Sequence, residues 1–311
     1  MEDINKIADA FGLRHDLIYK VRYYYIVKSG RAEYRIVPTA LTEERLNELY
    51  SIKEELFAKG LNVCDRFIKT PEGALTVKGE ESGYIVIEGV RGHPVEFENT
   101  GDIPAVYRAL GNMHSVLKKI ECKRVNLVED YVKGCNRLKS IKKQLNCSKK
   151  LNDTDIDFIK NYRTYFDLAE NATKTLEGLS FGVTGPIHGA LKEDNILVGR
   201  NVFFMDWELS RSGHFMEDVA QLTSRYMRKY ACCHKDYFTL DELLSRYTEG
   251  NPVDNRELAI FYALLMYPKR YISICAKHYG KAHRFTPVGI QKKFEECYEN
   301  RDFFLHYIGV E

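Results

Sequence analysis

The sequence predicts an α+β fold in two parts: a small N-terminal β-sheet lobe with one main helix, and a larger, mostly helical C-terminal lobe. Within residues 1–90, short runs rich in aromatic and β-branched residues alternate with turn residues, which is typical of a sheet. From residue 91 onward, apolar residues recur mainly at helical spacing. A chain of 311 residues exceeds one ordinary domain. We therefore expect one lobe over 1–90 and another over 91–311.

Each element of the first lobe has a local signal. Thr42 is a typical helix N-cap, and Glu43 and Glu44 suit the positive end of a helix dipole. Turn residues around Gly30 separate two extended runs and predict a hairpin. The elements expected in order are a helix over 4–11, strands over 18–27 and 32–37, a helix over 42–60, and strands over 66–69, 74–77 and 84–88. The lobe should thus contain five strands.

The second lobe shows one exception to its helical pattern. Helices are expected around 106–117, 154–175 and 214–230, but residues 196–205 form two apolar runs around Gly199-Arg200-Asn201, which indicates a hairpin. Asn195 and Asp206 flank its open end, so they should lie side by side. Both residue types also cap turns, but this joint spacing favours a magnesium site, because Mg²⁺ takes oxygen donors from one or two side chains and from substrate phosphates.

Composition excludes several classes of function. Lysine and arginine number 46 against 44 acidic residues, so no global charge attracts nucleic acid. The chain has no apolar run of about 20 residues and no N-terminal signal pattern, so we expect an intracellular, cytoplasmic protein without a membrane partner. The eight cysteines lack Cys-x-x-Cys spacing, and Cys232-Cys233-His234 has too few neighbouring donors to favour zinc.

A motif near residue 190 resembles that of a known superfamily. The segment His188-Gly189-Ala190-Leu191-Lys192-Glu193-Asp194-Asn195 precedes the expected hairpin, and Asp206-Trp207-Glu208 follows it. This order resembles the aminoglycoside phosphotransferase and choline kinase superfamily, with its His-Gly-Asp-x-x-x-x-Asn loop, hairpin and Asp-Trp/Phe-Glu/Asp segment. Asp218-Val219-Ala220 resembles the Asp-Leu-Ala pattern of the same superfamily. Within it, Tyr267-Pro268-Lys269-Arg270-Tyr271 resembles the tail of spore-coat-associated kinase-like proteins of endospore-forming bacteria.

The resemblance implies a protein-kinase-like fold that uses ATP and Mg²⁺ to phosphorylate a hydroxyl group of a small molecule. The N-terminal lobe would bind the nucleotide, with Glu88 at the junction of the two lobes, where a ligand cleft is expected. Asn195 and Asp206 would hold magnesium, and Lys192 would contact the transferred phosphoryl group. His188 would orient the loop. Spore-coat proteins would be the partners, and the spore coat an alternative location.

Two positions depart from the pattern. Ala190 occupies the place of the catalytic Asp, and its methyl group can neither accept a proton nor orient a hydroxyl. Val37 occupies the place of the strand lysine that pairs with the nucleotide phosphates. Arg35 lies two residues earlier and therefore on the same strand face, from which it could reach a phosphate.

These departures leave two hypotheses. The chain is either a degraded, inactive phosphotransferase that binds Mg-ATP weakly or not at all, or an active small-molecule kinase. In the second case Asp194 substitutes for the missing base, or Ala190 is an engineered replacement of an active-site Asp. The acceptor pocket of this superfamily is built from variable helices, so the sequence does not identify the phosphate acceptor.

Overall fold

The computed structural model describes residues 4–80, 82–122, 126–179, 181–182, 184–280 and 285–309. The chain forms two compact units: Met1–Ile120 with His188–Arg211, and Glu121–Ile187 with Ser212–Glu311. The first unit therefore contains both the N-terminal sheet and the loop around residue 190. It holds all the candidate site residues, namely Arg35, Val37, Glu88, Ala190, Lys192, Asp194, Asn195 and Asp206.

The first unit is built on a six-stranded antiparallel sheet with the strand order β1-β2-β3-β6-β4, in which β5 also pairs with β6. Its strands are β1 (Leu17–Val21), β2 (Tyr24–Ser29), β3 (Ala32–Thr39), β4 (Phe67–Ile68), β5 (Val77–Lys78) and β6 (Gly83–Glu88). The expectation of five strands was wrong, because the run 18–27 folds into two strands that meet at Arg22 and Tyr23. Arg22 has φ 54°, a left-handed conformation that non-glycine residues seldom adopt.

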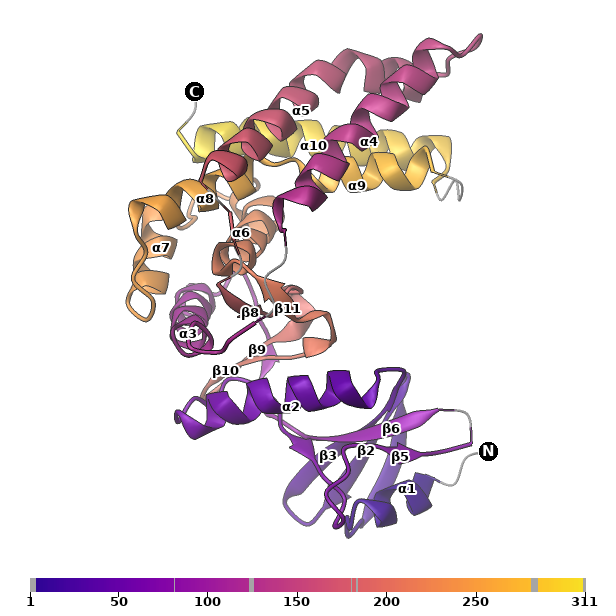
Figure 1. Ribbon diagram of the computed structural model, residues 1–311, viewed down its shortest axis with the longest axis vertical. Helices are drawn as coiled ribbons and strands as arrows, with labels where there is room; N and C mark the ends of the chain where they lie inside the picture. Colours follow the sequence, from indigo (N-terminus) through magenta and orange to yellow (C-terminus); the bar gives the residue numbers. More distant parts are fainter. Residues whose placement is uncertain are drawn as a thin grey trace. The chain divides into compact units, whose positions relative to one another are not determined.

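Two helices cover opposite faces of this sheet (Figure 1). On one face, helix α1 (Ile4–Ala10) packs against the strands. The core there contains Ile7, Ala8, Phe11, Leu13, Val27, Ile36, Tyr84 and Val86. On the other face lies helix α2 (Glu43–Ala58), which buries Leu46, Leu49 and Leu56. The hydroxyl of Thr42 accepts a hydrogen bond from the Arg45 N–H at 3.3 Å, which confirms the predicted N-cap.

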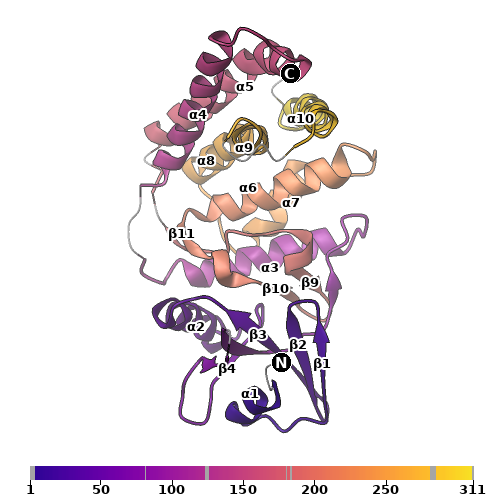
Figure 2. The same cartoon turned by 90° about the vertical axis from the view of Figure 1, so that its right-hand side faces the viewer.

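The predicted hairpin is also confirmed. Strands β9 (Ile196–Val198) and β10 (Val202–Phe204) pair antiparallel, and β7 (His93–Pro94) adds a third strand beside β9. Helix α3 (Asp102–Leu117) lies along this hairpin (Figure 2). A parallel bridge between Cys64 and Phe204, together with a 2.7 Å bond from the Phe204 N–H to the Val63 carbonyl, joins the hairpin to the segment before β4.

The second unit is mostly helical. Its helices are α4 (Val128–Asn146), α5 (Asp153–Gly178), α6 (Phe215–Tyr226), α7 (Leu240–Thr248), α8 (Asn255–Met266), α9 (Lys269–His278) and α10 (Pro287–Tyr307). A π-helical segment, Met227–Ala231, continues α6, and the short strands β8 (Gly185–Ile187) and β11 (Arg211–Gly213) pair with each other. Stacked aromatic side chains, including Phe158, Tyr165 and Tyr271, fill the contacts between α5 and α9.

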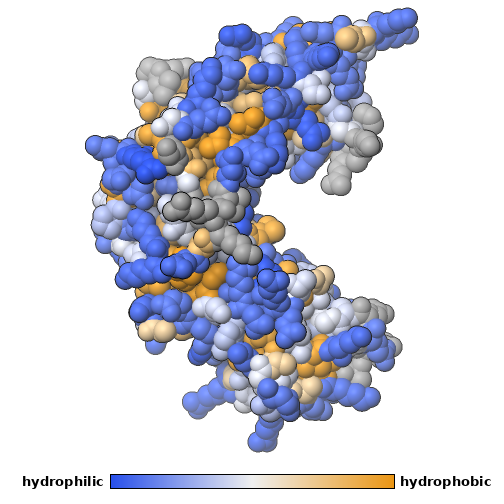
Figure 3. Space-filling model, in the orientation of Figure 1, coloured by the Kyte–Doolittle hydropathy of each residue, from blue (hydrophilic) through white to orange (hydrophobic). Residues whose placement is uncertain are grey.

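The surface of this unit is hydrophilic over α4 and the turn that leads to α5 (Figure 3). Lys139 and Lys143 are exposed there, as are Lys149 and Lys150. Among the described helices, none is both long and apolar enough to cross a membrane. The sheet of the first unit and the helices of the second confirm the predicted α+β fold class.

Candidate functional site

The hairpin brings Asn195 and Asp206 next to each other. Ile196 is paired with Phe204, and one step further out the Met205 N–H donates to the Asn195 carbonyl at 2.8 Å. Asp206 follows directly. Asn195 and Asp206, eleven positions apart in the sequence, are therefore adjacent at the open end of the hairpin, as the sequence predicted.

The side chain of Asn195 is buried, fixed in orientation and only half satisfied. The residue is 2% exposed, and its Nδ2 donates to the Ala190 carbonyl at 3.0 Å. Its Oδ1 has no hydrogen-bond partner in the part of the chain that the structure describes. A buried acceptor without a partner costs about 1–3 kcal/mol. The loop thus holds an unused amide oxygen in a defined place, which is what a metal ligand requires.

Asp206 places a second oxygen-bearing side chain at the end of the hairpin, on a strained backbone. Its φ and ψ are both 60°, in the left-handed region, and its side chain is exposed. Such a conformation costs about 1–3 kcal/mol and is concentrated at functional sites. The described residues contain no cluster of three or more His, Cys, Asp or Glu side chains that could cage a metal. A pair of oxygen donors completed by phosphates and water suits Mg²⁺.

His188 and Gly189 fix the loop against the hairpin. The His188 Nε2–H donates to the Met205 carbonyl at 2.8 Å, and its Nδ1 accepts from the Ala190 N–H at 3.3 Å. These bonds define a neutral imidazole protonated on Nε2. Gly189 has φ 75°, and a Cβ there would lie 2.6 Å from the Leu209 carbonyl oxygen. No other residue type fits this backbone without displacement.

Trp207 also supports the β9–β10 hairpin. Its Nε1–H donates to the Phe204 carbonyl at 2.7 Å, and its ring meets the His188 ring edge-on with centroids 5.0 Å apart. The indole is 2% exposed. Trp207 therefore packs the segment that carries Asp206.

The loop itself offers no carboxylate at its centre. Ala190 is half-buried and contributes its backbone carbonyl to Asn195. Lys192 is half-buried just before the 3₁₀ turn Glu193–Asn195, and Asp194 is exposed within that turn. A proton acceptor in place of the methyl group would have to come from another residue.

Arg35 and Val37 lie on the α2-facing side of the sheet. Arg35 is paired with Ile26 and Ile87, and Val37 is paired with Ile85, so these side chains share one face. Val37 is half-buried among them and contributes no charge. The position of the strand lysine thus belongs to an apolar surface, and Arg35 provides the cation on this face.

Glu88 does not join that group. It is paired with Tyr34, which packs against the α1 core on the opposite side of the sheet. Alternation along β6 therefore separates its side chain from Arg35. The Glu88 N–H donates to the Arg66 carbonyl at 2.8 Å, so its described bond is structural.

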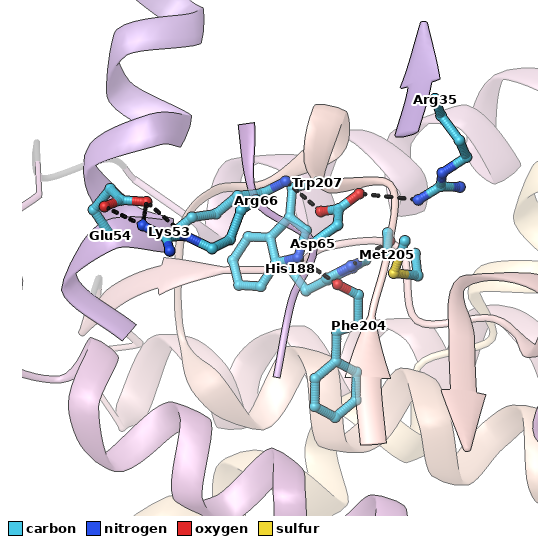
Figure 4. A network of polar contacts seen from close by, with 9 residues as sticks. All are labelled: Arg35, Lys53, Glu54, Asp65, Arg66, His188, Phe204, Met205 and Trp207. Carbon is cyan, nitrogen blue, oxygen red and sulfur yellow. Dashed lines mark hydrogen bonds and ion pairs between the residues drawn. The ribbon is translucent and has the colours of Figure 1, made fainter. Parts of the chain in front are cut away.

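Sequence reasoning missed a buried ion pair beside Arg35. The Lys53 Nζ lies 2.5 Å from Asp65 Oδ1, and the Arg35 Nη2 lies 3.3 Å from Asp65 Oδ2 (Figure 4). Lys53 also lies 4.3 Å above the Phe67 ring. The sequence offered only weak signals for this pair. Asp65 directly follows the apolar residues Val63 and Cys64, and Lys53 follows Ile52 on the buried face of α2.

Tyr23 was also missed, because the sequence placed it inside a strand. It stands in the β1–β2 turn with 61% of its surface exposed. Its partial burial and then the negative charge of Asp206 raise the pKa of the Tyr23 hydroxyl. The turn therefore lies within electrostatic range of Asp206 at the end of the β9–β10 hairpin.

A family model described as "Spore coat putative kinase YutH" matches residues 4–181, more than half of the 311-residue chain. The match ends before the His188 loop. No curated protein matches the chain.

Solved structures of kinases share the fold at low sequence identity. An aminoglycoside phosphotransferase from Alicyclobacillus acidocaldarius has a TM-score of 0.81 at 14% identity, covering 97% of this chain and 94% of that one. An amicoumacin kinase in complex with AMP-PNP, Ca²⁺ and Ami has a TM-score of 0.66 at 15% identity, covering 96% and 92%. The choline kinase LicA from Streptococcus pneumoniae has a TM-score of 0.54 at 17% identity, covering 96% and 97%.

Proposed function

Because the chain belongs to the spore-coat YutH family and has the fold of the kinase-like phosphotransferases, we propose that it binds Mg-ATP but transfers phosphate poorly or not at all. One observation carries the proposal: the buried Asn195 oxygen, which has no partner among the described residues, stands beside Asp206, while residue 190 presents a methyl group. Metal-binding groups are kept where the proton acceptor is missing.

The metal half of the proposal rests on the donor set. The Asn195 Oδ1 and the Asp206 carboxylate would hold one magnesium ion, and phosphates and water would complete its shell. When bound, the ion neutralises charge on the β- and γ-phosphates. The solved amicoumacin kinase structure holds a nucleotide analogue and a divalent cation, so this fold accommodates both.

The nucleotide half rests on the sheet face that contains Arg35. Ile26, Val37 and Ile87 are half-buried there and offer an apolar surface for a base. The guanidinium of Arg35 would contact phosphate oxygens, which it can bind in a forked geometry that a lysine does not offer. Lys192 would approach the terminal phosphate from the loop.

The deficit in transfer follows from Ala190. In kinases the loop carboxylate accepts the proton of the attacking hydroxyl, and loss of a general base costs about 10²- to 10⁴-fold. Positioning and charge supply the rest of the rate enhancement. We therefore expect a small residual turnover with a small-molecule hydroxyl or with water as acceptor.

We also propose, from the family description alone, that the protein functions in the spore coat with coat proteins as partners.

Thermal shift tests the binding proposal. ATP with magnesium should raise the melting temperature of the unaltered chain more than ATP with EDTA does, because a ligand stabilises in proportion to its occupancy. The variants Asp206→Ala and Asn195→Leu should lose this difference. Glu193→Gln, which alters a carboxylate in the same 3₁₀ turn, should keep it. A shift independent of magnesium, or no shift in the unaltered chain, would overturn the proposal.

A further inference from the structure

Two cations in the first unit share one buried carboxylate. Lys53 Nζ contacts Asp65 Oδ1 at 2.5 Å, and Arg35 Nη2 contacts Asp65 Oδ2 at 3.3 Å. The three side chains together carry one net positive charge. In kinases the strand cation is instead paired with an acid on the helix. Here the helix α2 contributes a cation, and the acid comes from the segment before β4.

The two contacts differ in a way that leaves Arg35 accessible. The side chains of Lys53 and Asp65 are each 3% exposed, whereas that of Arg35 is 23% exposed. The ion pair with Lys53 is shorter and less exposed to solvent than the one with Arg35. Lys53 therefore neutralises most of the negative charge of Asp65. A guanidinium has five N–H donors, and the described contacts of Arg35 use one group, Nη2. The others remain for an anion.

Asp65 is held in place from both sides. The carbonyl of Val63 accepts from the Phe204 N–H at 2.7 Å, and the carbonyl of Arg66 accepts from the Glu88 N–H at 2.8 Å. The first bond joins the segment to the hairpin two residues before Asp206, and the second joins it to β6. Figure 4 shows the Asp65 carboxylate between the two cations. Arg35 is therefore anchored to the hairpin that carries the metal ligands.

We propose that Lys53 is a positioning residue for phosphate recognition, acting through Asp65. Lys53 neutralises the carboxylate. The contact with Asp65 then orients Arg35, while the charge and the remaining N–H donors of Arg35 stay available for a nucleotide phosphate. The inference rests on the proposed Mg-nucleotide binding. It assigns the phosphate contact to Arg35, which is held by a relay of three residues, Lys53, Asp65 and Arg35. Without Lys53, Arg35 would be the one cation that the described residues place in ion-pair contact with the buried carboxylate, and the carboxylate would then compete with the phosphate for it.

Isothermal titration with Mg-ADP and with adenosine tests the relay. Lys53→Met should weaken Mg-ADP binding about tenfold while adenosine affinity changes less than about twofold, because adenosine has no phosphate. Lys53→Arg keeps the charge and should retain affinity. The double variant Lys53→Met with Asp65→Asn removes both buried charges and returns the group to one net positive charge. It should recover Mg-ADP affinity to within about threefold of the unaltered chain.

Arg66→Gln provides the matched control, since it breaks the exposed Arg66–Glu54 pair on the same segment and should leave Mg-ADP affinity unchanged. A merely structural role for Lys53 predicts no recovery in the double variant. The inference about Lys53 is overturned, while the proposed function stands, if Lys53→Met has unchanged Mg-ADP affinity. The same holds if the double variant binds Mg-ADP no more tightly than Lys53→Met. Absence of Mg-ADP binding by the unaltered chain overturns the proposed function as well.

Discussion

Replacing Asn195 by leucine should leave the ligand-free chain as stable as before, or make it more stable, while abolishing magnesium-dependent nucleotide binding. The reason is that only one of the two polar atoms of the Asn195 amide is hydrogen-bonded. Its Nδ2 is bonded to the Ala190 carbonyl at 3.0 Å, whereas its buried Oδ1 has no partner in the described part of the chain. A residue kept for metal binding would cost stability when the metal is absent.

The magnitude follows from the two halves of the amide. Loss of the Nδ2 bond costs about 0.5–1.5 kcal/mol, and the half-buried Ala190 can turn its carbonyl to water. Removal of the unpartnered buried oxygen regains about 1–3 kcal/mol. The net change in the free energy of unfolding should lie between about −0.5 and 2.5 kcal/mol, where positive values favour the variant.

Denaturant unfolding in EDTA measures this change, and Asn251→Leu is the matched comparison. Asn251 is also 2% exposed, and its Nδ2 donates to the Tyr247 hydroxyl at 2.5 Å. Its replacement breaks a buried bond and should cost about 1–3 kcal/mol. If Asn195→Leu destabilises the chain as much as Asn251→Leu does, the Asn195 oxygen is already satisfied, and the reasoning for a metal ligand fails.

Two further predictions concern the loop and the segment beside it. Gly189→Ala should destabilise the chain by about 1–3 kcal/mol more than Gly60→Ala, since both glycines have positive φ but only at residue 189 would a Cβ meet a backbone oxygen, that of Leu209; equal losses in denaturant unfolding would contradict the clash. Burial raises the pKa of the Cys64 thiol to about 12, so the reactive thiolate is scarce until the pH approaches that value. Iodoacetamide at pH 9 should modify the exposed Cys147 and spare Cys64 by mass spectrometry, and comparable labelling would show that Cys64 is accessible.

The parts that the sequence predicted well depend on local signals. The hairpin β9–β10 was foreseen because a turn separates two apolar runs, and its register then sets Asn195 beside Asp206. The N-cap at Thr42 was foreseen for the same kind of reason. By contrast, the turn at Arg22 and Tyr23 contains no glycine, proline or asparagine, so nothing local marked the split between β1 and β2.

The parts that were missed depend on tertiary contacts. Lys53 and Asp65 meet only because the segment before β4 lies against α2, an arrangement that neither residue's neighbours disclose. Glu88 was expected at the nucleotide site, but its side chain lies on the α1 face because its register with Tyr34 fixes the alternation along β6. The two-residue spacing correctly placed Arg35 on the same strand face as Val37, but its anchoring by Asp65 required the folded chain.

The most direct test of the central claim is the rate of ADP formation from saturating Mg-ATP by the unaltered chain and by Ala190→Asp, measured together with the affinity of each for Mg-ADP. We predict similar affinities and a rate about 10²- to 10⁴-fold higher for the variant, because only the proton acceptor has been restored. Equal rates in the two proteins would contradict the account, since the methyl group of Ala190 would then not be what limits transfer.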